Sequence, residues 1–164
     1  MLRHLIAILL LPFVVVVIMP RWLLTAWTDQ DLRWPEAPWV DFGHVAGILI
    51  FTAGLLLFAW CVLLFARVGR GTLAPWDPTR QLVAVGPYRY MRNPMISGVA
   101  TMLVGEALFF GSALLAGWTA AFVLINHLYF RLSEEPGLER RFGAAYVEYR
   151  TRVPRWLPRI TTTK

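Results

Sequence analysis

The 164-residue sequence contains a single cysteine, Cys61, which excludes an internal disulfide and a cysteine-based metal cluster. It has no His/Cys/carboxylate spacing typical of a metal site and no serine-centred nucleophile elbow. A P-loop and the G-x-G-x-x-G run of dinucleotide-binding folds are absent too. We therefore expect no bound metal and no soluble Rossmann-type cofactor domain.

Charged residues are scarce, at 16%, whereas 57% of the residues are hydrophobic and the mean hydropathy is +0.54. Soluble domains are about half apolar. The apolar residues fall in four long blocks, and a bilayer span needs roughly 20 such residues. The sequence therefore predicts an all-α, polytopic membrane protein with spans at about 5–27, 44–66, 95–110 and 113–130.

Two details qualify these spans. No small-residue cleavage site follows the first block, so we expect a retained span rather than a signal peptide, with kinks at Pro12 and Pro20. The last two blocks are joined only by Gly111 and Ser112. A junction this short predicts a helical hairpin that turns at the far membrane interface.

Acidic and basic residues are separated along the chain. Segment 28–43 carries four acidic residues against Arg33, whereas segment 67–94 carries five arginines against Asp77, and the tail is also rich in arginine. Basic loops stay in the cytoplasm, so we expect an inner-membrane protein with both termini and loop 67–94 cytoplasmic. Topology and anionic lipid account for the net charge of +6, and nucleic acid is not needed as a partner.

The tail after residue 130 has helical periodicity. Apolar residues from Leu138 to Val153 share one face, which predicts an amphipathic cytoplasmic helix, with Pro136 in its first turn and Ser133 or Glu135 as its cap. Segment 153–159 alternates cations, prolines and tryptophan, and we expect it in the headgroup region. The chain is thus one membrane domain, 1–164, in which loop 67–94 and tail 131–164 form the functional site.

Segment 86–94, directly before the third predicted span, is the first candidate site. Gly86-Pro87 predicts a tight turn, and Pro94 suits the first turn of a helix. Free N–H groups at a helix start favour an anion such as a carboxylate, to which Arg89 or Arg92 is able to add a bidentate contact. Plain membrane anchoring by these arginines is the alternative.

Three glutamates are further candidates. Glu134 and Glu135 follow the fourth predicted span, where they either accept from a ribose diol, face a cation, or simply cap the tail helix. Glu106 lies inside the third predicted span, and an acid there is a functional candidate by default. Twelve residues of helix from Pro94 rise about 18 Å, so we expect Glu106 beyond mid-bilayer and away from His127.

Several of these segments, in this order, resemble the isoprenylcysteine carboxyl methyltransferase and phospholipid methyltransferase superfamily of integral membrane enzymes. Asn93 stands where the family usually has histidine, and Ile96 stands in place of a tyrosine, so one polar contact is lost. The matching residues are Leu73 to Pro78, Gly86 to Tyr90, Arg92 to Pro94, Glu134, Glu135, Phe142, Gly143, Tyr146, Tyr149 and Val153 to Arg155.

The resemblance implies S-adenosylmethionine bound at the cytoplasmic face. The turn at 88–94 would hold the amino-acid end, Glu134 or Glu135 the ribose or amino group, and Tyr146 with Tyr149 a lid. His127 and Tyr129 would line the adenine or sulfonium side. The expected catalytic residues are Arg92, Glu135 and Arg150, and the expected cofactor-binding residues are Gly86, Tyr88, Arg89, Tyr90, Asn93, Pro94, His127, Tyr129, Glu134 and Glu135.

The methyl acceptor would be lipophilic and would arrive sideways from the inner leaflet between the spans. A phospholipid amine, an isoprenylcysteine-like carboxylate and a small thiol all stay open. A non-catalytic four-span scaffold or lipid-binding protein is the alternative, although it gives no reason for paired acids beside an arginine-rich turn. A phosphatidyltransferase would need clustered aspartates, and Asp77 stands alone on that side.

Overall fold

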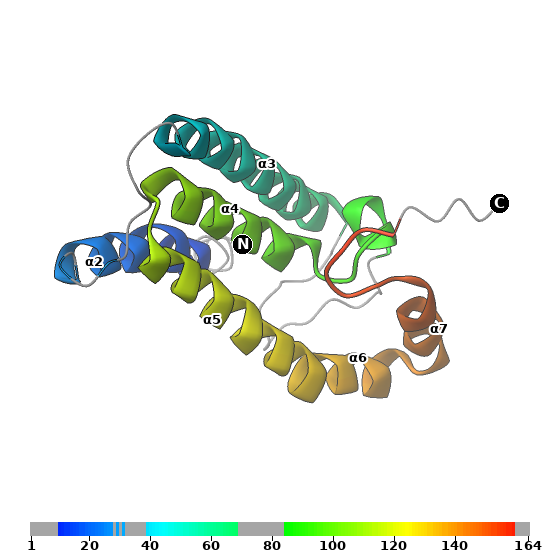
Figure 1. Ribbon diagram of the computed structural model, residues 1–164. Coiled ribbons are helices and arrows are strands. Elements are labelled where there is room, and N and C mark those ends of the chain that lie inside the picture. The colour runs from blue at the N-terminus through cyan, green and yellow to red at the C-terminus, as the bar shows by residue number, and fades with distance from the viewer. Residues whose placement is uncertain (1–9, 28, 30, 32–38, 69–83, 160–164) are drawn as a thin grey trace.

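A computed structural model describes residues 10–27, 29, 31, 39–68 and 84–159. The predictions for the first residues of the chain, for Arg33, and for segment 69–83 with Asp77 concern residues outside these ranges. The described residues are helical throughout, with short connections (Figure 1). The elements are η1 (Val14–Ile18), α2 (Met19–Ala26), α3 (Trp39–Val68), η3 (Gly86–Arg89), α4 (Pro94–Phe110), α5 (Ala113–Tyr129), η4 (Phe130–Glu134), α6 (Glu135–Phe142) and α7 (Ala144–Arg152).

The first apolar helix, Leu10–Ala26, contains a π turn just before Pro20. The Met19 N–H bonds to the Val14 carbonyl. The next acceptor in this register, the Val15 carbonyl, would need an N–H that Pro20 does not have. Trp118 of α5 supplies it instead, donating its Nε1–H to the Val15 carbonyl at 3.1 Å. A π turn therefore precedes Pro20, where a kink was predicted, and the freed Val15 carbonyl connects this helix to α5.

Helices α3 and α4 run side by side in close contact (Figure 1). Gly47 and Gly54 of α3 lie against Gly105 and Gly98 of α4. A Cβ added at any of the four would come within 2.6–2.9 Å of a backbone atom of the other helix. The two backbones therefore touch directly, which is how small residues let apolar helices pack in membranes.

Helices α4 and α5 form the predicted hairpin. Gly111 ends α4 in the left-handed region at φ 60°, and Ser112 caps α5 by accepting from the Leu115 N–H at 3.2 Å. Asp31 adds a second cap, because its Oδ1 accepts from Ser112 Oγ at 2.9 Å and from the Leu114 N–H at 3.1 Å. The acidic segment 28–43 thus contributes to this end of the bundle.

The predicted tail helix is neither separate from the helix before it nor continuous to Val153. The helix that begins at Ala113 runs on to Phe142 through the π turn η4, so Pro136 lies inside a continuous helix, and neither Ser133 nor Glu135 caps a new one. Pro136 has no N–H to donate, and the π turn before it lets the helix continue without that hydrogen bond. Gly143, at φ 55°, then separates α6 from α7.

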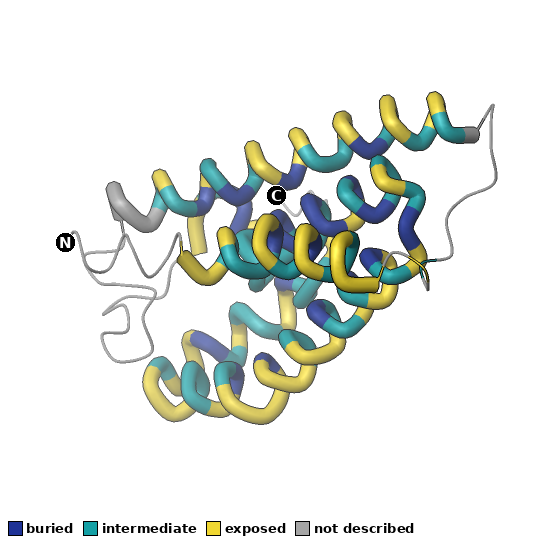
Figure 2. The backbone as a smooth tube through the Cα atoms, turned by 90° about the vertical axis from the view of Figure 1, so that its left-hand side faces the viewer, coloured by how far each residue is buried: buried dark blue, intermediate teal, exposed yellow. Residues whose placement is uncertain are grey.

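Two helices are long and apolar enough to cross a membrane, at Val40–Leu64 and Ala113–Phe142, whereas Leu10–Ala26 and Pro94–Phe110 are apolar but shorter. The all-α class is confirmed, and the four-span count stays a prediction for the shorter pair. The outer surfaces of the helices are largely exposed (Figure 2). On α3 they carry large apolar side chains such as Phe42, Leu49 and Leu56, as expected of a surface that faces lipid.

Candidate active site

The turn before α4 has the conformation that its glycine and prolines predict. Gly86 has φ 57° and packs against Leu64 of α3. The Gly86–Arg89 helical turn follows, and Pro94 opens α4. Tyr88 is buried, whereas Arg89 and Tyr90 are exposed. The turn is therefore folded against the ends of α3 and α4.

A C-terminal strap, residues 153–159, crosses this turn (Figure 1). The Arg92 N–H donates to the Pro154 carbonyl at 2.8 Å, and the Arg159 N–H donates to the Tyr90 carbonyl at 3.1 Å. Ser97 Oγ on α4 also donates to the Trp156 carbonyl at 3.4 Å. The strap was expected in the headgroup region as part of the tail that forms the site, and it is bound to the predicted turn.

Glu135 joins three segments that are far apart in sequence. Its Oε1 accepts from Arg92 Nη1 of the turn at 2.8 Å and from Arg155 Nε of the strap at 2.7 Å, and its Oε2 accepts from Arg155 Nη2 at 3.0 Å. The Glu135, Arg92 and Arg155 side chains are only 10%, 11% and 20% exposed. This cluster is a shielded, partly bidentate ion pair with an excess of one positive charge.

His127, near the end of α5, lies beside the cluster. Its Nδ1 accepts from Trp156 Nε1–H at 3.2 Å, and its Nε2 is 3.5 Å from Arg155 Nη1. The Trp156 ring packs on Phe130, with centroids 5.6 Å apart. An indole N–H only donates, so a neutral His127 in this contact carries its proton on Nε2.

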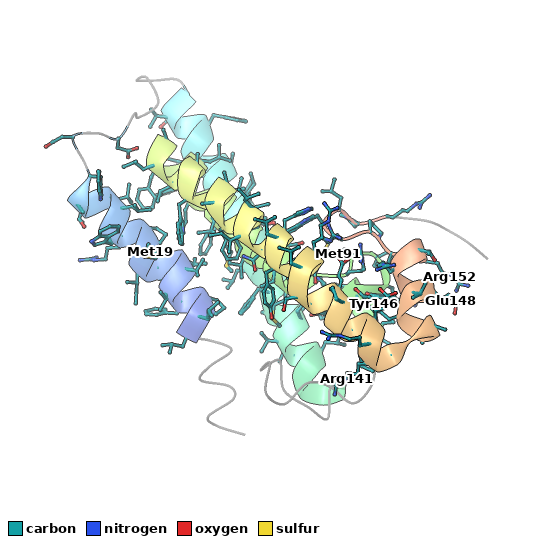
Figure 3. The ribbon with its side chains drawn as sticks, turned by 90° about the horizontal axis from the view of Figure 1, so that it is seen from below. Met19, Met91, Arg141, Tyr146, Glu148 and Arg152 are labelled. Atoms are coloured by element: carbon teal, nitrogen blue, oxygen red, sulfur yellow. The ribbon has the colours of Figure 1, made fainter. Side chains whose placement is uncertain are left out.

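Two tyrosines of α7 face the turn. Tyr149 donates its hydroxyl to the Tyr88 carbonyl at 2.6 Å, and Tyr146 is almost fully buried. Burial raises the pKa of Tyr146, although a hydrogen bond with Arg92 acts in the opposite sense, and burial also raises the pKa of Tyr149. In Figure 3, Tyr146 lies on the side of α7 that faces the rest of the molecule, and Glu148 and Arg152 lie on the opposite side.

The structure brings three of the predicted site residues together: Arg92 and Glu135 pair directly, and His127 is linked to them through Arg155. Glu134 precedes Glu135 on the helix and is half-buried. Asn93 begins α4 without a side-chain cap bond, and Tyr129 is exposed. Arg150 lies elsewhere, paired with Glu139 at 2.9 Å. Glu106 has its Oε2 buried with no partner among the described residues.

Arg155 and Trp156 were not recognised as site residues from the sequence. Their signal was present: prolines at 154 and 158 lack N–H groups, so they favour an extended chain with free carbonyls. Such a segment needs donors from outside itself, and the turn provides them. The arginine and tryptophan between the two prolines are then held in place against Glu135 and His127.

A groove of about 570 Å³ lies between α4 and α5 and reaches His127. Its walls are almost wholly apolar, with Val104 and Ala107 on one side and Ala120 and Leu124 on the other. Thr119 also lines it, but its hydroxyl donates to the Leu115 carbonyl of its own helix at 2.8 Å. The groove therefore suits a hydrocarbon chain, with its polar group at the His127 end.

Metal-binding groups of three or more His, Cys, Asp or Glu side chains are absent from the part of the chain that the structure describes. The sequence profile of the phospholipid methyltransferase family matches residues 42–145, more than half of the chain. This protein therefore belongs to that family, as the resemblance indicated. No curated protein and no solved structure matches the chain.

Proposed function

We propose that this member of the phospholipid methyltransferase family transfers a methyl group from S-adenosylmethionine to a lipophilic acceptor. The reaction would occur where the turn, Glu135 and the strap meet. We place this end of the bundle at the cytoplasmic face of an inner membrane, and the arginine distribution supports this placement. The observation that supports the proposal most directly is that family membership coincides with a shielded cluster of Arg92, Glu135 and Arg155.

The polar groups at this end fit the cofactor, which has an anionic carboxylate, an amino group and a ribose diol. Arg92 has a buried Nε with no partner among the described residues, and a carboxylate is its natural acceptor. Asn93 and the N–H groups that open α4 add further donors. Glu135 already pairs with two arginines, so we assign it to positioning them and assign the ribose or amino end to Glu134.

When bound, S-adenosylmethionine supplies a methyl group on a sulfonium that is open to in-line displacement. The protein's contribution is then orientation and exclusion of water. Phe130, Tyr146 and Trp156 provide buried or half-buried aromatic surface around the ion cluster. The charges of Arg92 and Glu135 are held in place by their pairing, so they would interact with the reacting groups in place of water without having to reorient.

The apolar groove between α4 and α5 supports a lipid acceptor. Its apolar walls extend to His127, which lies beside Arg155. A lipid chain in the groove would therefore bring its polar end to the ion cluster. Both a phospholipid amine and an isoprenylcysteine-like carboxylate meet this requirement. Membrane lipids are thus the expected partners.

Calorimetric titration of S-adenosylmethionine into the detergent-solubilised protein tests the cofactor assignment. Glu134→Gln should weaken binding at least about tenfold, because a charged hydrogen bond is lost. Glu148→Gln is the matched control, since Glu148 is an exposed acid on α7 that pairs with Arg152, and its affinity should not change. Lipid binding without any cofactor binding would instead favour the non-catalytic lipid-binding function.

A further inference from the structure

The strap is held beside the ion cluster by a hydrogen bond that only one form of His127 is able to make. Trp156 donates its Nε1–H to Nδ1 of His127 at 3.2 Å. An indole N–H donates and does not accept, so Nδ1 must be unprotonated for this bond to form. The neutral ring with its proton on Nε2 meets that condition, whereas an imidazolium, which donates from both nitrogens, does not.

The surroundings of His127 also oppose a positive charge on its ring. Nε2 is 3.5 Å from Arg155 Nη1, and Arg155 belongs to a cluster in which one carboxylate faces two guanidinium groups. Both oxygens of that carboxylate, Glu135, already accept from arginines. Among the residues that the structure describes, no carboxylate contacts the His127 ring. An imidazolium here would therefore repel Arg155 without a counter-ion of its own.

The remaining groups around His127 do not compensate for this charge. The residues of α4 that line the groove beside it are apolar, and Asn126 donates its amide N–H to the Phe122 carbonyl at 2.8 Å. His127 is half-buried, so a proton from solvent is able to reach the ring. The charged residues that follow on η4 are Arg131 and Glu134.

We propose that neutral His127 is a positioning residue that holds the strap on the ion cluster, and that protonation of its ring releases the strap. Docking and protonation compete for the same lone pair on Nδ1. The docked protein therefore binds fewer protons than the undocked one, so docking is lost as the pH falls through the range in which histidine changes charge, about pH 8 to 5. Arg155 precedes Trp156 on the strap, so release would also separate Arg155 from Glu135 and open the cluster to water.

Imidazole ¹⁵N NMR of the full-length protein in detergent tests the tautomer directly. At the alkaline end of this range, the His127 signals should show a proton on Nε2 and none on Nδ1. The Trp156 indole N–H, identified by its loss in Trp156→Phe, should be shifted downfield by the bond. Both features should disappear together on acidification. A proton on Nδ1 at alkaline pH, or a Trp156 signal that does not move across the range, would overturn the proposal.

Amide hydrogen exchange measures the docking itself. The Arg92 N–H donates to the Pro154 carbonyl of the strap at 2.8 Å, whereas the neighbouring Met91 N–H donates to the Pro87 carbonyl within the turn at 3.1 Å. Uptake of one proton changes an equilibrium constant by up to about tenfold per pH unit. Across the whole range, protection of the Arg92 N–H, corrected for the intrinsic exchange rate, should therefore fall at least about tenfold. Protection of the Met91 N–H should stay constant, and equal changes at both amides would contradict a release confined to the strap.

Substitutions of His127 separate its titration from that of other groups. In His127→Asn the amide oxygen takes the place of Nδ1 as an acceptor and does not bind a proton. Arg92 protection should then match the unmodified protein at alkaline pH and stay constant on acidification. His127→Leu has no acceptor and should show weak protection at every pH. Glu134 and Tyr146 are retained in both variants, so an undiminished pH dependence in His127→Asn would refute the role of His127.

The consequence for the cofactor rests on the proposed function. On acidification, the calorimetric affinity for S-adenosylmethionine should fall about tenfold more in the unmodified protein than in His127→Asn, because only the unmodified protein releases Arg155. Equal falls would contradict a positioning role for His127. Absence of cofactor binding, with the pH-dependent exchange of the Arg92 N–H intact, would remove the methyltransferase proposal and leave the control of the strap by His127 standing.

Discussion

Glu135→Gln is the substitution with the largest expected effect on stability. The change leaves Arg92 and Arg155 facing each other without a carboxylate, although their side chains are only 11% and 20% exposed. Removing one partner from a buried ion pair costs about 3–5 kcal/mol. For a chain of this length, 1 kcal/mol lowers Tm by about 2–4 °C. We therefore expect Tm in detergent, followed by tryptophan fluorescence, to fall by about 6–20 °C.

Glu139→Gln is the control for this experiment. Glu139 pairs with Arg150 at 2.9 Å, but these side chains are 43% and 38% exposed, and such pairs contribute about 0–1 kcal/mol. Glu135→Gln combined with Arg155→Gln should cost less than the sum of the single changes, because the unpaired cation is removed. Equal Tm values for Glu135→Gln and Glu139→Gln, or strict additivity of the pair, would refute the buried cluster.

Three further substitutions test the packing of the helices and of the site. Gly54→Ala places a Cβ 2.6 Å from the Gly98 carbonyl oxygen and should destabilise the protein by about 1–3 kcal/mol. Gly117 has open space around it, so Gly117→Ala should be neutral or slightly stabilising. Denaturant titration compares the free energies of unfolding of the two variants. Burial raises the pKa values of Tyr149 and Tyr88. The neutral phenols therefore make their full contribution to the free energy of unfolding below about pH 10, the pKa of an unfolded tyrosine. This contribution is lost as the pH rises through the pKa values of the folded state. Tyr149→Phe should cost about 1 kcal/mol at neutral pH and show a smaller decline above pH 10.

Hydropathy predicted helix positions well where a turn residue gave an independent boundary. Pro94 and Gly111 delimit α4 as expected, because one opens a helix without needing an N–H and the other takes φ 60°. The fourth helix was cut short at 130, since Pro136 was interpreted as a helix start. A π turn lets a helix pass a proline, and neither periodicity nor composition encodes that choice.

The candidate site was predicted in part for a similar reason. Arg92 and Glu135 stand out in sequence as charged residues at span ends, and they do pair. Arg155 also pairs with Glu135, which lies 20 residues earlier in the sequence. This pairing depends on how the chain folds back after Gly143. That backbone reversal is a tertiary outcome, so the pairing of Arg155 with Glu135 did not follow from the sequence, although the tail as a whole was expected at the site.

Transfer of label from methyl-tritiated S-adenosylmethionine to lipid is the most direct test of the proposed activity. The purified protein, incubated with labelled cofactor and extracted membrane lipids, should place radioactivity in the chloroform-soluble fraction. At a limiting cofactor concentration, Glu134→Gln should lower this signal about tenfold and Glu148→Gln should retain it. Label that stays wholly in the aqueous phase for the folded, unmodified protein would contradict the account.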